Sequence, residues 1–475
     1  MWNIQQAYID GAFVPVQGSE RLEILSPATG QPIGTVTLAN RDDAKRAIEA
    51  ASRAQPALAG STKAQRIDML RRLEAAVLAR TEQICEATIE EYGGPLARSR
   101  WVSNYASQCF ADTARMLEGY DFERRMGDAI VRMEPVGVAG LIAPWNSTAG
   151  SICSKLASAI AAGCASVIKP SEFSPLQARV VTEALHEAGL PAGAVNVLLG
   201  RGGDVGDEIA THPAIAKISF TGSTATGKLI ARAGLETLKR VSLALSGKSA
   251  TVVLDDADLA TVLPMALGAA FMNNGQACVA GTRLLIPNAR MTEAIERLRV
   301  AAAAMRVGDP RDPATAVGPL ASKAQFERVQ RFIRRGLEQG ATLVAGGEGR
   351  PDGFDKGWFV RPTVFAGVRN DMDIAREEIF GPVLSVIGYD GEDEAVEIAN
   401  DSPYGLQAYV FSSQQQRALD VASRLRVGSV LVNRVTPELS APFGGVKQSG
   451  IGREFGLFGM EAFLEPKTVA LAQPG

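Results

Sequence analysis

The chain has 475 residues, of which 46% are hydrophobic and 21% are charged, and its formal net charge is −3. This length is enough for two or three domains with substantial cores, and the composition is that of an ordinary globular protein. The small negative charge gives no reason to expect a nucleic-acid partner or an anionic membrane surface.

Cysteine and histidine usage narrows the classes of site further. The five cysteines are scattered and form no Cys-x-x-Cys pair, so a reducing compartment is the simpler interpretation. The two histidines, His186 and His212, lie late in predicted helices and have no partner at metal-ligand spacing. We therefore expect both histidines to be structural and no metal site to be present.

Two features bear on localisation. The first residues lack a basic patch followed by an apolar core, so they do not form a signal peptide. The longest apolar segment, residues 156–168, is too short and too rich in alanine and glycine to span a bilayer. We expect a cytoplasmic protein with no membrane partner.

The N-terminal part predicts strands followed by helices. Residues 7–40 alternate short apolar runs with turn residues, which predicts an antiparallel β entry. Residues 42–57 and 63–91 carry helical periodicity. Residues 121–132 then predict two strands around a Gly-Asp turn. A hairpin that interrupts a helix-rich region indicates an interaction element.

From residue 137 onward, short strands alternate with helices. Strands are predicted at 138–142, 166–168, 195–199 and 215–220, and helices at 151–162, 175–188, 204–211 and 224–233. This alternation is typical of a doubly wound parallel sheet, in which ligands bind at the carboxyl ends of the strands. A second α/β unit starts near residue 250, with helices predicted at 292–305 and 323–339 and a closing strand at 467–471.

The residues that follow these strands favour a dinucleotide. Asn146 follows the first strand, Lys169 and Glu172 follow the second, and a small-residue loop at 221–227 follows the fourth. Such a loop at the start of a helix offers free N–H groups to a phosphate. Lys169 can hydrogen-bond a ribose, and Glu172 can accept both hydroxyls of an adenosine ribose, which favours NAD over NADP.

The same loop also resembles the phosphate loop of ATPases. Residues 222–228 match the first seven positions of that motif, but Leu229 occupies the eighth. Leucine cannot supply the hydroxyl that ligates magnesium, so an ATPase is disfavoured.

One cysteine, Cys278, lies between two glycines in residues 271–283, after a buried apolar helix at 263–270 and before a strand at 284–286. Glycines let the backbone approach a bound group, and a thiol near free backbone N–H groups can act as a nucleophile. From the residues alone, a buried cysteine that acts as a small hydrophobe is the alternative.

The pattern Asn-x-Gly-Gln-x-Cys-x-Ala-Gly-Thr-Arg over residues 273–283 resembles the nucleophile segment of the aldehyde dehydrogenase superfamily. Residues 220–227, 376–383, 399–406 and 442–454 resemble other segments of that family, in the expected order. The resemblance covers essentially the whole chain.

The resemblance to this superfamily implies an α/β fold with two doubly wound domains and a small β element for oligomerisation. The NAD-binding domain is expected at 1–120 and 141–247, the catalytic domain at 248–440, and the oligomerisation hairpin and tail at 121–140 and 460–475. A homodimer or homotetramer follows from this element.

The resemblance also implies NAD-dependent oxidation of a small-molecule aldehyde to a carboxylic acid. The Cys278 thiolate is expected to attack the carbonyl, while the Asn146 amide and the Cys278 N–H hold the oxyanion, giving a thiohemiacetal and then a thioester. Without a nearby histidine, the thiol must be activated by local dipoles, by the positive ring of the cofactor or by a base acting through water. The positions matched to the cofactor are Ile142, Ala143, Trp145, Lys169, Ser171, Glu172, Gly202, Phe220, Gly222, Ser223, Thr226, Leu245, Gln325, Glu378 and Phe380.

One stretch departs from the family pattern Leu-Glu-Leu-Gly-Gly-Lys. Residues 243–248 read Leu-Ala-Leu-Ser-Gly-Lys, so Ala244 replaces the carboxylate that activates the hydrolytic water, and Ser246 replaces a glycine. General-base help is worth about two to four orders of magnitude in rate. We therefore expect thioester hydrolysis to be slow.

Four explanations of Ala244 are open. They are an introduced Glu→Ala change, another carboxylate such as Glu378 acting as base, acyl transfer to coenzyme A, and a catalytically weak relative kept for binding. The candidate walls of the substrate site are largely apolar or small, which favours an uncharged aliphatic or aromatic aldehyde unless they are plain packing residues. These positions are Tyr105, Met116, Trp145, Ala277, Val279 and Phe443.

Overall fold

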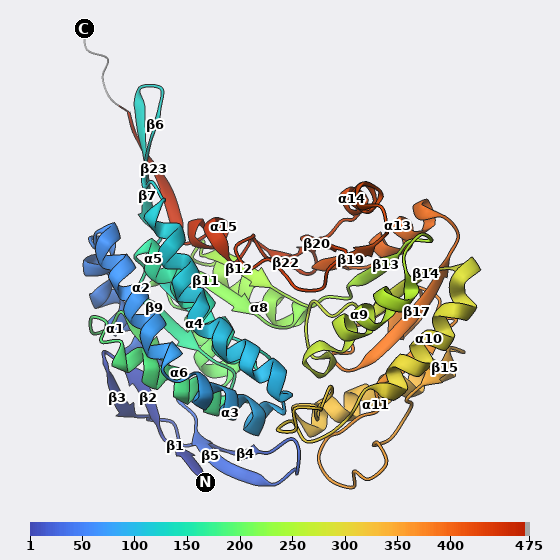
Figure 1. The fold of residues 1–475 in the computed structure, drawn as a ribbon. Helices are drawn as coiled ribbons and strands as arrows, with labels where there is room; N and C mark the ends of the chain where they lie inside the picture. Colours follow the sequence, from blue (N-terminus) through green and yellow to red (C-terminus); the bar gives the residue numbers. More distant parts are fainter. Residues whose placement is uncertain (471–475) are drawn as a thin grey trace.

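The structure is a computed structural model that describes residues 1–470. Figure 1 shows two α/β lobes side by side, each built around one large sheet, and a narrow sheet that projects away from the first lobe. The α/β fold with two large sheets and a small β element is therefore confirmed.

The first lobe contains an eight-stranded sheet of order β22-β12-β11-β8-β9-β10-β2-β3. Its five central strands, β12 to β10 in that order, are parallel, which confirms the doubly wound core, and antiparallel strands close both edges. The strands are β2 (Gln6–Ile9), β3 (Ala12–Pro15), β8 (Val138–Ile142), β9 (Ser166–Lys169), β10 (Val195–Val197), β11 (Ile215–Thr221), β12 (Arg240–Ala244) and β22 (Gly450–Ile451).

The helices of this lobe differ from the prediction in three places. The helical stretch 63–91 is two helices, and the helix 204–211 begins as a π-helix at Gly202–Gly206, where three glycines loosen the backbone. The long helix α4 was not predicted. The helices are α1 (Arg41–Ala59), α2 (Lys63–Leu78), α3 (Thr81–Tyr92), α4 (Leu96–Glu118), α5 (Thr148–Ala162), α6 (Pro175–Glu187), α7 (Asp207–Thr211) and α8 (Thr224–Leu235).

The second lobe contains a seven-stranded sheet of order β15-β16-β17-β14-β13-β19-β20, parallel except for β15. Its strands are β13 (Ala250–Val253), β14 (Arg283–Pro287), β15 (Thr342–Ala345), β16 (Thr363–Ala366), β17 (Val383–Tyr389), β19 (Gln407–Phe411) and β20 (Ser429–Val432). Its helices are α9 (Leu259–Phe271), α10 (Met291–Ala304), α11 (Lys323–Glu338), α12 (Asp373–Arg376), α13 (Glu392–Asn400) and α14 (Gln415–Arg424).

The projecting sheet joins the predicted hairpin to the end of the chain. β6 (Glu123–Met126) and β7 (Ala129–Pro135) turn at Gly127, and β23 (Leu464–Ala470) pairs with β7 along its whole length. The hairpin and the closing strand are thus confirmed, except that residues 471–475 lie outside the described residues. The exact domain boundaries stay predictions.

The β entry is only partly antiparallel. β4 (Arg21–Leu25) pairs antiparallel with β5 (Pro32–Thr37), whereas β1 (Trp2–Ile4) pairs parallel with β5. The two strands between them, β2 and β3, form an antiparallel edge on the large sheet.

Both histidines lie where a structural role was predicted. The His186 ring, in the last turn of α6, packs against the rings of Tyr8 and Phe13, and Nδ1 of His212 accepts the Ala214 N–H at 3.1 Å. Among the described residues, no group of three or more acidic, histidine or cysteine side chains is arranged to hold a metal ion. Within residues 1–470, every helix is too short or too polar to cross a membrane.

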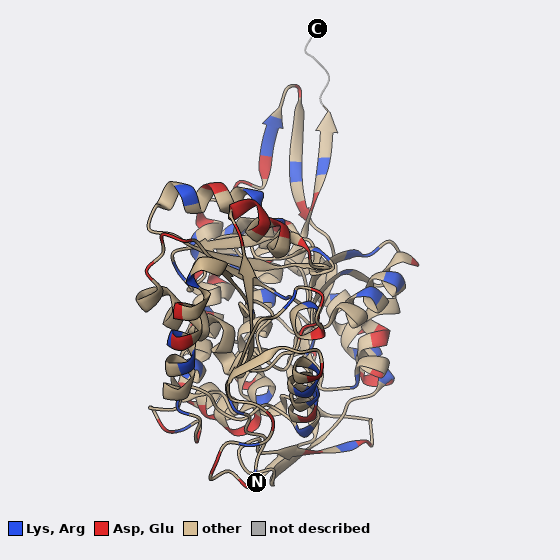
Figure 2. Cartoon of the chain, turned by 90° about the vertical axis from the view of Figure 1, so that its right-hand side faces the viewer, with Lys and Arg blue, Asp and Glu red and all other residues tan. Residues whose placement is uncertain are grey.

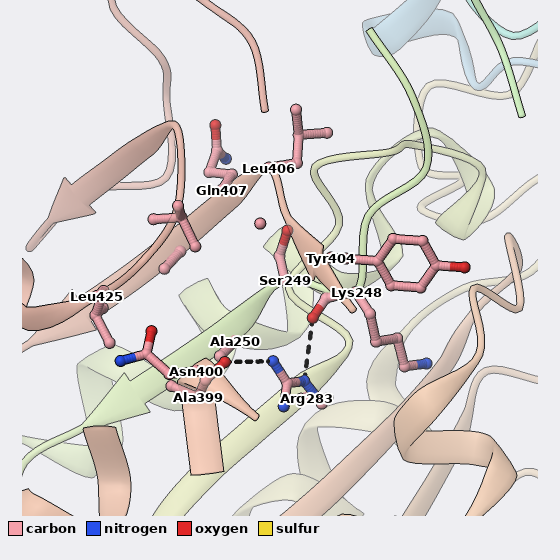
Figure 3. A pocket seen from close by; sticks show the side chains of 13 residues that line it. Lys248, Ser249, Ala250, Arg283, Ala399, Asn400, Tyr404, Leu406, Gln407 and Leu425 are labelled. Atoms are coloured by element: carbon pink, nitrogen blue, oxygen red, sulfur yellow. Dashed lines mark hydrogen bonds between the residues drawn. The ribbon is translucent and has the colours of Figure 1, made fainter. Parts of the chain in front are cut away.

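Arg283, the last residue of the cysteine motif, has a structural role. Its buried guanidinium donates to the carbonyls of Lys248 at 3.0 Å, Ile398 at 2.9 Å and Ala399 at 2.9 Å, beside a small pocket (Figure 3). These bonds tie β14 to α13 and to the segment that precedes β13. A buried cation without a carboxylate is tolerated because the carbonyls solvate it.

We expect Arg283→Met to lower the free energy of unfolding by about 3 kcal/mol, because three buried carbonyls lose their donor. Urea unfolding followed by fluorescence measures this loss. Arg369→Met is the matched control, since that side chain is 65% exposed. Equal stability of the two variants would show that the Arg283 bonds contribute nothing.

Candidate active site

The carboxyl ends of parallel strands gather most of the predicted residues at one edge of the first sheet. Ile142 ends β8, Lys169 ends β9, Phe220 lies near the end of β11, and Ala244 ends β12. The other predicted residues of this group follow these strands directly: Ala143, Trp145, Asn146, Ser171, Glu172, Gly222, Ser223 and Leu245. The structure therefore brings residues from four separate segments together.

The turn from β11 into α8 requires its glycines. A Cβ on Gly222 would lie 2.4 Å from the Phe220 ring, and a Cβ on Gly227 would lie 2.5 Å from Leu245. Ser223 caps α8, and its Oγ accepts the Thr226 N–H at 3.2 Å. The result is a compact, partly exposed helix N-terminus of the kind that binds phosphate.

Lys169 and Glu172 form an ion pair at this edge of the sheet. Nζ of Lys169 is buried, donates to Pro170 O at 2.9 Å and Gly200 O at 2.8 Å, and lies 3.3 Å from Glu172 Oε2. Burial lowers the pKa of Lys169, and the Glu172 charge opposes this shift. Arg201, just before Gly202, lies 3.7 Å from Glu172 but pairs more closely with Glu20, at 2.7 Å.

The loop that carries the cysteine has an unusual backbone. Asn273, Asn274 and Gly275 all have positive φ, at 56°, 58° and 72°. Such a run is costly for residues other than glycine and persists only when the surroundings hold it. Asn274 provides that hold, because its side chain donates to Gly93 O and Pro319 O and accepts the Gly318 N–H at 2.7 Å.

Three segments meet at Cys278. Nδ2 of Asn146 donates to Gln276 O at 2.9 Å, and the Asn273 amide donates to Asn146 O at 3.0 Å. From the side of β12, Gly247 approaches so closely that a Cβ on it would lie 2.2 Å from Cys278 O. The predicted nucleophile and the predicted oxyanion donor are therefore neighbours, and Ala244 lies three residues before Gly247.

Glu378 is hydrogen-bonded to the backbone of Gly247. Its Oε1 accepts the Gly247 N–H at 3.0 Å, and the Ser246 hydroxyl also hydrogen-bonds to it. Burial raises the pKa of Glu378, and these hydrogen bonds oppose that shift. The carboxylate is thus held by the segment that departs from the family pattern.

The segment that follows Glu378 is fixed by α11. Gln325 donates to Ile379 O at 3.0 Å and Phe380 O at 2.6 Å. Phe380 has φ of 61°, and its ring lies 5.4 Å from the Trp145 ring. In this structure Gln325 contacts the backbone of the segment, so its direct role toward a ribose stays a prediction.

Burial and a nearby carboxylate set the electrostatics of the Cys278 thiol. Burial and then the Glu378 charge raise the pKa of Cys278 to about 12, although the Cys278 and Val279 N–H groups act in the opposite direction. Cys278 is half-buried, whereas the other four cysteines are buried. The local dipoles expected to activate the thiol are outweighed by burial and by Glu378.

Some predicted wall residues lie together and others do not. Phe443 stacks on Phe455 at 5.4 Å, and Phe455 meets Tyr105 edge to face at 6.1 Å. Met116 instead lines a surface groove with residues 437–440, farther along α4. Sequence reasoning missed Phe455 and also Arg98 and Trp101, which lie on the same face of α4 as Tyr105; their spacing of three and four residues was the available signal.

Comparison with known proteins agrees with this geometry. The sequence model described as "Aldehyde dehydrogenase family" matches residues 13–469. A 3-succinoylsemialdehyde-pyridine dehydrogenase from a Pseudomonas species is 42% identical over 471 residues, which cover 99% of each chain.

Solved structures agree equally well. An aldehyde dehydrogenase C mutant from Pseudomonas syringae, in complex with NAD+ and octanal, matches with TM-score 0.97 and 41% identity over 98% of this chain and 96% of that one. A betaine aldehyde dehydrogenase from Staphylococcus aureus, in complex with NAD+, matches with TM-score 0.94 and 34% identity over 98% and 94%.

We expect iodoacetamide to alkylate only Cys278 in the native chain, with a rate that rises about tenfold per pH unit from pH 7 to 10. The thiolate is the reactive form, and with a pKa of about 12 its fraction increases over this whole window. Mass spectrometry of quenched samples measures the rate. Glu378→Gln removes a negative charge and is expected to speed alkylation; a plateau below pH 9 in the unmodified chain would contradict the raised pKa.

Proposed function

The chain belongs to the aldehyde dehydrogenase family and is an aldehyde-oxidising oxidoreductase, and we propose that it works with NAD through a thioester on Cys278. The observation that carries the proposal is the meeting of Asn146 with the Cys278 loop at the carboxyl edge of a parallel sheet. In this arrangement a reacting carbonyl can reach both the thiol and the amide donor.

In the proposed reaction, Cys278 is the nucleophile and Asn146 is the hydrogen-bond donor. Cys278 first loses its S–H proton to solvent; the thiolate Sγ then bonds to the aldehyde carbon, and the carbonyl oxygen becomes an oxyanion that accepts hydrogen bonds from the Asn146 amide and the Cys278 N–H. Loss of hydride from this thiohemiacetal leaves a thioester, and water then releases the carboxylic acid and the thiol. NAD, when bound, supplies the hydride acceptor.

The residues at the sheet edge fit a dinucleotide. Gly222 and Gly227 let the start of α8 pack directly against Phe220 and Leu245, and the free N–H groups at that helix N-terminus suit a pyrophosphate. Glu172 suits the ribose hydroxyls of NAD and opposes a 2′-phosphate. Arg201, which could otherwise offset Glu172, already pairs with Glu20. The two solved relatives bind NAD+, which supports NAD over NADP for this chain.

Deacylation is proposed to be the slow step. Ala244 is buried at the end of β12 and has no proton acceptor. The Glu378 carboxylate is beside this segment, but it already accepts hydrogen bonds from the Gly247 N–H and the Ser246 hydroxyl. The usual water-activating group is therefore missing while the nucleophile and the oxyanion donor remain.

We expect octanal and NAD to give a rapid burst of NADH equal to the number of active sites, followed by slow turnover. Stopped-flow absorbance measures both phases. Ala244→Glu is expected to keep the burst and to raise the slow rate roughly a hundredfold or more, since a general base contributes that much. Ala244→Gln, which has a similar shape but no basic carboxylate, is the matched control.

Other outcomes separate the remaining explanations of Ala244. Acceleration of the slow phase by coenzyme A would assign the chain to the acyl-transferring dehydrogenases. Fast steady turnover without coenzyme A would show that another group activates water. If no aldehyde gave a burst, the proposed oxidation itself would be wrong.

We also propose that the protein is a homodimer or homotetramer in the cytoplasm. The three-stranded sheet leaves β6 and β23 as edges, and it extends from the body with charged side chains on its strands (Figures 1 and 2). On α8, Leu229 and Leu235 are 62% and 67% exposed. Open edges and exposed apolar side chains are typical of surfaces that meet a second copy. The five free cysteines fit a reducing compartment.

Light scattering is expected to give two or four times the mass of the 50.1 kDa chain. Replacing Leu229 and Leu235 by Asp is expected to lower that mass, because a charge is costly in an apolar contact. A monomer at micromolar concentration would contradict the proposal.

A further inference from the structure

Arg98, in the first turn of α4, is a cation without a protein partner. Its half-buried side chain takes part in no ion pair or hydrogen bond within residues 1–470, and its Nε is fully buried without an acceptor. Its one direct contact of note is with Trp101, whose ring lies 4.3 Å below the guanidinium carbon. By contrast, Arg115 on the same helix lies 3.0 Å from Asp112.

The guanidinium lies on the side of the catalytic loop. Burial lowers the pKa of Arg98, and the ionisable groups whose charge opposes this shift are Tyr92, Cys278 and Tyr105. Tyr92 contacts the loop directly, because its hydroxyl donates to Asn273 O at 2.9 Å and accepts from Gln276 at 3.1 Å. No carboxylate is among these neighbours, and an arginine stays protonated even when burial disfavours its charge.

The same face of α4 continues into the aromatic wall of the site. Arg98, Trp101 and Tyr105 are three and four residues apart, so they form one stripe along the helix. The Trp101 and Tyr105 rings stack at 5.3 Å, and Tyr105 meets Phe455. Gly150 on α5 leaves room for this wall, since a Cβ there would lie 2.8 Å from the Tyr105 ring. The face of α4 that carries Arg98 is thus a row of aromatic rings with a single positive end.

A half-buried guanidinium without an acceptor is costly, because the water it loses is not replaced. We propose that a carboxylate of the substrate supplies the missing acceptor, so that the preferred substrate is an aldehyde with a carboxylate at its other end. Two parallel N–H···O bonds to Arg98 would hold that carboxylate, and the apolar middle of the molecule would lie along Tyr105 and Phe455. The inference rests on the proposed aldehyde oxidation and adds a charge to the apolar substrate that the wall residues favour.

The test compares ω-oxo acids of four to eight carbons with their methyl esters, which have the same aldehyde and the same chain. The initial burst of NADH measures acylation. At the best length, we expect kcat/KM for this step to be about 100-fold higher for the acid, a typical effect for a desolvated charge pair. A wild-type protein that prefers the esters at every length would overturn the proposal.

Variants of Arg98 and Arg100 test whether Arg98 causes the preference for the acid over the ester. Arg98→Met is expected to remove the acid-over-ester ratio by raising KM for the acid, with little change for the ester, whose turnover shows that the variant is folded. Arg98→Lys is expected to retain part of the ratio, since it keeps the charge without the bidentate geometry. Arg100→Met is the matched control, because Arg100 is exposed and lies on another face of α4.

The outcomes separate this inference from the proposed function. An acid preference that survives Arg98→Met would place the carboxylate elsewhere and contradict the inference. Oxidation of esters and octanal without any acid preference would leave the dehydrogenase activity intact and remove the role of Arg98. Failure of every aldehyde to react would instead count against the oxidation itself.

Discussion

The backbone of the loop before Cys278 is the constraint on which the rest of the site depends. Three successive left-handed residues turn the chain sharply between α9 and the nucleophile. The amide side chains of Asn273, Asn274 and Gln276 stabilise this turn by bonding to parts of the chain that are distant in sequence. Because one of these bonds reaches the Asn146 carbonyl, the interactions that hold the turn also hold the proposed oxyanion donor against the cysteine loop.

The proposed site keeps the residues assigned to acylation and lacks the one assigned to hydrolysis. Asn146 and the Cys278 loop are joined by two hydrogen bonds, one from the Asn146 amide to Gln276 O and one from the Asn273 amide to Asn146 O. At the end of β12, the proposed position of the water-activating base holds the buried Ala244. Ser246, the second departure in this stretch, hydrogen-bonds to Glu378. The two departures from the family pattern lie on one segment.

Two arginines, the buried Arg283 and the half-buried Arg98, show how the surroundings decide the role of a cation. Arg283 is surrounded by carbonyl oxygens and therefore stabilises the second lobe. Arg98 has an aromatic ring on one side and no acceptor for its Nε. The same side chain is structural where the protein completes its hydrogen bonds and is available to a ligand where the protein does not.

The sequence alone determined the features that depend on local pattern. The alternation of strands and helices indicated a doubly wound sheet, and the motif around Cys278 together with the family resemblance indicated the reaction class. The absence of a base at Ala244 stays a prediction. The hairpin at 121–132 followed from its turn residues. Helix α4 was missed, and with it the stripe of Arg98, Trp101 and Tyr105, although its spacing was present in the sequence.

Only the tertiary structure decided which groups complete one another. Whether a buried guanidinium is paired depends on carbonyls and carboxylates that are distant in the chain, as for Arg283 and Arg98. The raised pKa of Cys278 depends in the same way on burial and on Glu378, which lies 100 residues farther along the chain. Hydrogen bonds and charges act through space over a few ångströms, so local sequence pattern cannot specify them.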